Sequence, residues 1–75
     1  MPTQLGFYTY GEDLCAGLTG PFNTREEALA HVAFCTTRGD ADPGTVITGA
    51  EAHAKQVEDP GMLVLTPEAD RAFVV

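Results

Sequence analysis

The sequence predicts a single α+β domain over residues 1–75, in ββαβαβα order, with one mainly antiparallel sheet and helices on one face. Two observations favour this class. Aromatic and small residues alternate with a period of two near the start of the chain, as in a half-buried strand. Two later segments are preceded by Thr-x-x-Glu, the pattern of a helix N-terminus. At 75 residues the domain is short, which leaves little room for a catalytic cleft.

The first two strands are predicted to form a hairpin. Residues 4–10 alternate, so that Phe7 and Tyr8 face opposite sides of the first strand. A turn of Gly and acidic residues follows, and residues 14–19 form the second extended segment. Gly20-Pro21 is expected to end that strand.

The first helix is predicted over residues 25–38. Thr24 and Glu27 form a capping box, in which each side chain binds a free backbone N–H at the helix start. Gly39 provides the C-terminal stop. The residues at helical spacing that we expect to form its apolar stripe are Leu29, Val32, Ala33 and Thr36, with Ala28 and Cys35 beside them.

A strand over residues 45–48 is expected to lead into a second helix. Thr48 and Glu51 form another capping box, so residues 49–58 are predicted as an Ala-rich helix. A strand remains the alternative for this segment, because Ala alternates there with polar residues.

The chain is predicted to end in one more strand and one more helix. Residues 62–65 have the composition of a short buried strand. Thr66-Pro67 is typical of an N-cap followed by proline at the first helical position, which opens a last short helix.

The charge balance excludes some classes of partner. Eleven acidic residues stand against four basic ones, giving a net charge of −7. Direct binding to nucleic acid or to an anionic membrane requires a basic face, so neither is expected. The start of the chain has no secretory pattern and no apolar run is long enough for a membrane span, which predicts a cytoplasmic protein with reduced cysteines.

The predicted strand and helix directions bring six carboxylates to one end of the molecule. These are Glu12, Asp13, Asp40, Asp42, Glu58 and Asp59. Several of them follow helix C-termini, where an anion does not stabilise the helix. Two interpretations stay open: the acids maintain solubility, or they form an anionic surface for a cationic partner.

Tyr8 and Tyr10 are further candidates for partner binding. They share one face of the first strand. If the helices cover the Phe7 face, both rings are exposed and could anchor a protein partner. The alternative is cross-strand packing within the sheet.

No catalytic residue, metal site or cofactor is predicted. The sequence contains no serine, and His31 and Cys35, although four residues apart on one helix, are interpreted as a core thiol and a surface or hydrogen-bonded imidazole. A metal site made of Cys15, His31, Cys35 and His53 would require distant residues to converge without a Cys-x-x-Cys motif.

The segment Gly20-Pro21-Phe22-Asn23-Thr24-Arg25-Glu26-Glu27-Ala28 resembles the strand-to-helix junction of many short bacterial and phage proteins. In size, charge and architecture the chain is similar to small acidic phage-borne inhibitors of the anti-CRISPR type. That resemblance implies a non-enzymatic, stoichiometric inhibitor, monomeric or homodimeric, that occupies the basic DNA-binding surface of a CRISPR effector complex. The alternative is a non-enzymatic protein-interaction or regulatory module unrelated to CRISPR, for which a homodimer is one expected form.

Overall fold

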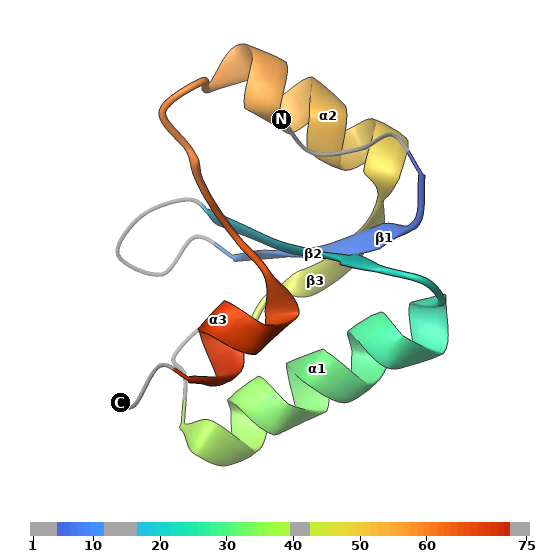
Figure 1. Cartoon of the computed structure of the whole chain (residues 1–75), viewed down its shortest axis with the longest axis vertical. Helices are drawn as coiled ribbons and strands as arrows, with labels where there is room; N and C mark the ends of the chain where they lie inside the picture. The colour runs from blue at the N-terminus through green and yellow to red at the C-terminus, as the bar shows by residue number, and fades with distance from the viewer. Residues whose placement is uncertain (1–4, 12–16, 40–42, 73–75) are drawn as a thin grey trace.

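The strands and helices follow the predicted ββαβαβα order in the computed structural model, which describes residues 5–11, 17–39 and 43–72 (Figure 1). The chain is an α+β domain, as predicted. Its elements are β1 (Phe7–Gly11), β2 (Gly17–Phe22), α1 (Arg25–Arg38), β3 (Thr45–Thr48), α2 (Gly49–Glu58), β4 (Leu63–Leu65) and α3 (Pro67–Arg71).

The sheet is mainly antiparallel and has the strand order β3-β1-β2-β4. β1 runs antiparallel to both β2 and β3, and only β4 pairs in parallel, with β2. β2 does not end at Gly20-Pro21 as expected, because Phe22 still pairs with Phe7. The register shifts between Phe7 and Thr9, and such an irregularity accommodates Pro21, which has no N–H for the ladder.

The helices lie on both faces of the sheet, so the prediction that they share one face is wrong. α2 covers one face, while α1 and α3 lie on the other (Figure 1). β2 and β3 run in the same direction, and α1 connects them across the sheet; α2 then carries the chain back toward β4. Connections between parallel strands are nearly always right-handed, so crossing the sheet in opposite directions places the two helices on opposite faces.

The main apolar core lies between the sheet and α2. Tyr8, Leu18, Ile47 and Ala52 are buried there, and Tyr10 and Met62 pack against them. Gly20 on β2 makes room for the Tyr8 ring: a Cβ at this position would lie 2.7 Å from Tyr8 Cδ2, and its φ of +154° is rarely adopted by other residues.

The helix boundaries follow the predicted caps. At α1 only half of the predicted capping box forms: Thr24 Oγ1 accepts from the Glu27 amide, but the Glu27 carboxylate accepts from the Thr24 hydroxyl at 3.5 Å and not from its amide. Gly39, with φ of +98°, ends α1. At α2, Thr48 Oγ1 accepts from the Glu51 amide at 3.2 Å, while Glu51 Oε1 accepts from the Thr48 amide at 3.0 Å. Residues 49–58 therefore form the predicted helix and not the alternative strand, and the helix begins at a complete capping box.

Removing the hydroxyl of Thr48 is expected to raise the pKa of Glu51. Hydrogen bonds from the Thr48 amide, and then from its hydroxyl, hold the pKa of Glu51 below its ordinary value. A lowered folded-state pKa adds stability that is present above the unfolded-state pKa and is lost as the pH falls through the folded-state pKa. In Thr48→Ala the free energy of unfolding should therefore depend less on pH in the acid range. Loss of the N-cap should also lower it by about 1 kcal/mol. NMR titration of Glu51 measures the pKa; Thr24→Ala is the control, and an unchanged Glu51 titration in Thr48→Ala would contradict the assignment.

The buried face of α1 differs from the predicted apolar stripe. Ala28, His31 and Cys35 are the buried residues of this helix, so the two residues placed beside the predicted stripe, Ala28 and Cys35, are buried. Of the predicted stripe, Val32 is half-buried, whereas Leu29 is 51% exposed and both Ala33 and Thr36 are also exposed. α1 therefore turns a polar face toward the sheet and α3.

Candidate functional site

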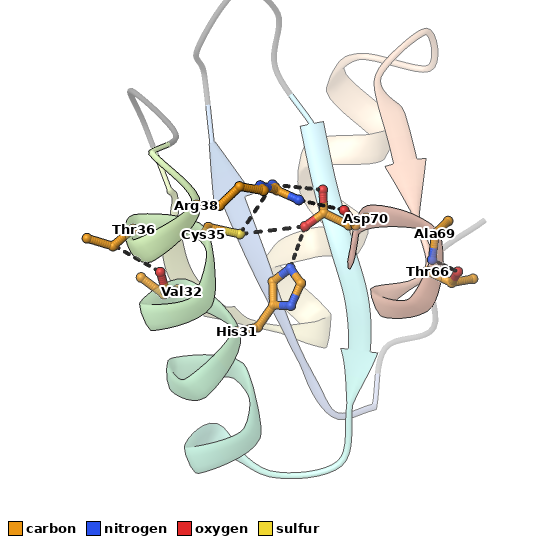
Figure 2. Close-up of polar contacts among 8 residues, drawn as sticks. All are labelled: His31, Val32, Cys35, Thr36, Arg38, Thr66, Ala69 and Asp70. Atoms are coloured by element: carbon orange, nitrogen blue, oxygen red, sulfur yellow. Dashed lines mark hydrogen bonds and ion pairs between the residues drawn. The ribbon is translucent and has the colours of Figure 1, made fainter. Parts of the chain in front are cut away.

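A cluster of polar side chains joins α1 to α3 (Figure 2). His31, Cys35 and Arg38 occupy positions i, i+4 and i+7 of α1, and such residues lie on one side of a helix. Asp70 projects toward them from α3, which begins at a Thr66 N-cap with Pro67 in its first turn. We call these four residues the α1–α3 cluster.

The Asp70 carboxylate lies at the centre of the α1–α3 cluster. Its Oδ2 lies 2.5 Å from His31 Nε2 and accepts a hydrogen bond from Cys35 Sγ at 3.6 Å. Its Oδ1 accepts from Arg38 Nη2 at 3.4 Å, and the Asp70 carbonyl accepts from Arg38 Nη1 at 2.6 Å. An ionised carboxylate only accepts hydrogen bonds, so His31 carries a proton on Nε2 when Asp70 is ionised.

The α1–α3 cluster is largely removed from solvent. His31 is 1% exposed, and its ring contacts those of Phe22 and Phe34, with centroids 5.2 and 5.9 Å away. The side chains of Arg38 and Asp70 retain 13% and 14% exposure. α3 has no buried residue of its own, so the contacts of Asp70 are a principal attachment of this helix to α1.

The α1–α3 cluster does not have the geometry of a nucleophile and base. In a Cys–His pair the thiol gives its proton to the imidazole, whereas Cys35 donates to Asp70. Cys35 and His31 are both buried, and His31 Nδ1 is buried without a hydrogen-bond partner. The α1–α3 cluster does bring together three kinds of metal ligand. One potential ligand atom each from His31 (a ring nitrogen), Cys35 (Sγ) and Asp70 (a carboxylate oxygen) lies within 4.8 Å of the others.

The predicted acidic surface is described only in part. Glu58 ends α2 and Asp59 is its C-cap; both are exposed. The other four predicted carboxylates lie outside the described residues: Glu12, Asp13, Asp40 and Asp42.

The two tyrosines lie beneath α2, not on an open sheet face. Tyr8 is 1% exposed and belongs to the core. Tyr10 is half-buried, and Lys55 of α2 places its Nζ 4.1 Å from the centre of the Tyr10 ring. The condition under which these rings would anchor a partner is therefore not met.

The four-ligand metal set considered from the sequence does not assemble among the described residues. His31 lies on α1 and His53 on α2, and these helices are on opposite faces of the sheet (Figure 1). Cys15 lies outside the described residues. Arg38 and Asp70 were not among the predicted site residues. The i, i+4, i+7 spacing of His31, Cys35 and Arg38 was the available indication of a polar helix face.

Three of the four basic side chains are engaged in contacts within the domain, and the fourth, Arg71, is exposed on α3. Arg25 lies over the Phe7 ring at 5.2 Å, Lys55 over Tyr10, and Arg38 contacts both Asp70 and the Phe34 ring. In contrast, most acidic residues of the described chain are exposed: Glu26, Glu27, Glu51, Glu58, Asp59 and Glu68. The described surface is therefore rich in carboxylates whose charge is offset by few outward-facing cations.

Comparison with known proteins gives no family assignment. No protein-family model, curated protein or solved structure matches the chain. Within the described residues, no helix combines the length and the apolar character needed to cross a membrane.

Proposed function

We propose that the chain is a non-enzymatic binding protein of the cytoplasm that acts as a stoichiometric inhibitor. Its carboxylates would occupy a basic, nucleic-acid-binding surface of a partner protein complex, and a CRISPR effector is the first partner to test. The observation that supports this proposal is the charge distribution: six acidic side chains of the described chain are exposed, whereas three of the four basic side chains contact the domain's own rings or Asp70.

The proposed mechanism is electrostatic competition with DNA. CRISPR effectors hold nucleic acid in positively charged channels. Carboxylates on a small domain can contact the same lysines and arginines, and opposite charge accelerates association. The inhibitor itself would not bind nucleic acid, because its net charge of −7 repels phosphate.

Reversal of the acidic charges tests this proposal. With Glu12, Asp13, Asp40 and Asp42 replaced by Lys, the protein is expected to lose inhibition of target-DNA binding by the effector. Inhibition by the unmodified protein should weaken as salt rises, because exposed charges are screened over about 8 Å at physiological ionic strength. DNA binding that is unaffected by excess protein would refute the proposal.

Two double variants test whether inhibition depends on where the carboxylates lie on the surface or only on the net charge. Glu58→Gln/Asp59→Asn removes two exposed carboxylates at the C-terminal end of α2, whereas Glu26→Gln/Glu68→Gln removes two from the first turns of α1 and α3. Both change the net charge equally. We expect only the first pair to weaken inhibition; equal effects would mean that total charge, and not a defined surface, determines binding.

A second candidate is a protein-interaction module that forms a homodimer. It is favoured by exposed apolar residues on α1, where Leu29 is 51% and Phe34 39% exposed. Sedimentation equilibrium distinguishes the two candidates. A dimer that survives the charge reversals and dissociates in Leu29→Gln would favour the second.

A further inference from the structure

We propose that His31, Cys35 and Asp70 form a binding site for one divalent transition-metal ion of the zinc class. The ligands would be an imidazole nitrogen, a thiolate and a carboxylate oxygen, each of which binds Zn²⁺ in proteins. This site differs from the four-ligand set considered from the sequence, because Asp70 takes part and neither Cys15 nor His53 is needed. The proposal does not depend on the inhibitor function.

The separations of the donor atoms are compatible with coordination. Bond lengths of about 2.0–2.3 Å in a tetrahedral zinc site place two ligand atoms roughly 3.3–3.6 Å apart. Cys35 Sγ and Asp70 Oδ2 are already 3.6 Å apart. His31 Nε2 and Asp70 Oδ2, now 2.5 Å apart across a hydrogen bond, would need to separate by only about 1 Å.

The scaffold holds the ligands in place before any metal enters. His31 and Cys35 are one turn apart on the fourteen-residue helix α1, and both side chains are buried. Figure 2 shows these two side chains and Asp70 pointing toward a common point between α1 and α3. The Asp70 side chain is 14% exposed, so this ligand is in contact with solvent, and water is the usual fourth ligand of an open zinc site with three protein ligands.

Arg38 suits the outer shell of such a site. Its guanidinium lies 3.6 Å from Cys35 Sγ and 3.4 Å from Asp70 Oδ1, so it can donate to two of the ligands. Outer-shell donors orient metal ligands and tune their affinity. The positive charge also favours the thiolate, which is the form of cysteine that binds metal.

Metal binding must displace protons from the cluster. Cys35 loses its thiol proton to solvent as the metal–sulfur bond forms. A neutral His31 that coordinates through Nε2 moves its proton to Nδ1, which is buried without a hydrogen-bond partner. The net result is about one proton released per metal bound, so the affinity should fall as the pH is lowered.

Titration of the full, chelator-treated chain with Co²⁺ and Zn²⁺ tests the proposal. We expect one equivalent of Co²⁺ to give thiolate-to-cobalt charge-transfer absorption together with the visible bands of a tetrahedral site. Zn²⁺ should displace the cobalt and raise the thermal unfolding temperature. Stoichiometric binding without a thiolate band, or no binding at micromolar metal, would overturn the proposal.

The chain offers matched controls, since it has two cysteines and two histidines. Cys35→Ser and His31→Gln should each weaken binding by more than the 10–100-fold that follows loss of an outer-shell partner. Cys15→Ser and His53→Gln should leave the affinity unchanged. A loss of binding in Cys15→Ser or His53→Gln would overturn this ligand assignment.

The unmodified protein provides a test that does not require a variant to fold. In nitrogen-15 NMR spectra of the histidine rings, Zn²⁺ should shift a ring nitrogen of His31 and leave His53 unperturbed. Equal shifts of both imidazoles, or none at His31, would refute the site.

Discussion

Replacing Asp70 with alanine is expected to lower the free energy of unfolding by roughly 3 kcal/mol, the lower end of the range for breaking a buried ion pair. The carboxylate accepts from His31, Cys35 and Arg38, and its side chain is only 14% exposed. Alanine would leave the buried His31 Nε2 without its acceptor, in a ring whose Nδ1 already has no hydrogen-bond partner. A chain of 75 residues has a total stability of about 4–11 kcal/mol, so this loss is a large part of it.

Urea denaturation in a buffer containing a chelator measures this loss independently of any bound metal. Glu68→Ala is the matched control, because Glu68 is an exposed residue of the same helix. Glu68→Ala is expected to change the free energy of unfolding by no more than about 0.5 kcal/mol. Hydrogen exchange should also show faster exchange of the α3 amides in Asp70→Ala. If the two variants are equally stable, the α1–α3 cluster does not hold α3.

The helices were predictable because their ends are encoded locally. The α1 and α2 boundaries agree with the prediction, since Thr24, Thr48 and Gly39 act on backbone groups within a few residues. Thr66 caps α3 in the same way. Such signals need no knowledge of distant parts of the chain.

The arrangement of the helices around the sheet was not predictable in the same way. It depends on the order β3-β1-β2-β4, which places β3 and β4 at opposite edges. That order is a long-range property, and once it is known the handedness of the connections places α1 and α2 on different faces. The error about the tyrosines follows directly, because α2 covers the face that carries Tyr8 and Tyr10.

The residues that make up the α1–α3 cluster could not be identified from local sequence either, because tertiary structure brings them together. An apolar stripe normally marks the buried side of a helix. On α1 the buried side instead carries His31 and Cys35, which are stabilised there by Asp70 from a helix more than thirty residues later. His31, Cys35 and Arg38 could be placed on one helix face from their spacing, but nothing near Asp70 in the sequence indicates its partners.

Truncating Tyr8 is expected to have a still larger effect, with Tyr8→Ala lowering the free energy of unfolding by about 3–5 kcal/mol. The ring is 1% exposed, packs with Leu18, Ile47 and Ala52, and lies against Gly20, where not even a Cβ would fit. Alanine would leave a cavity between the sheet and α2. This loss is a large part of the total stability of about 4–11 kcal/mol, and at the lower end of that range most of the Tyr8→Ala protein would be unfolded.

Comparison of Tyr8→Ala with Tyr8→Phe and Tyr10→Ala separates packing from partner contact. Tyr8→Phe keeps the ring and should cost within about 1.5 kcal/mol, while Tyr10→Ala removes a half-buried ring and should cost roughly 1–2 kcal/mol. Circular dichroism during urea denaturation gives the three values. Because Tyr8 is buried, we expect partner binding to follow the folded fraction in each variant. A Tyr8→Ala protein that remains folded yet no longer binds would instead place Tyr8 in the contact and contradict its assignment to the core.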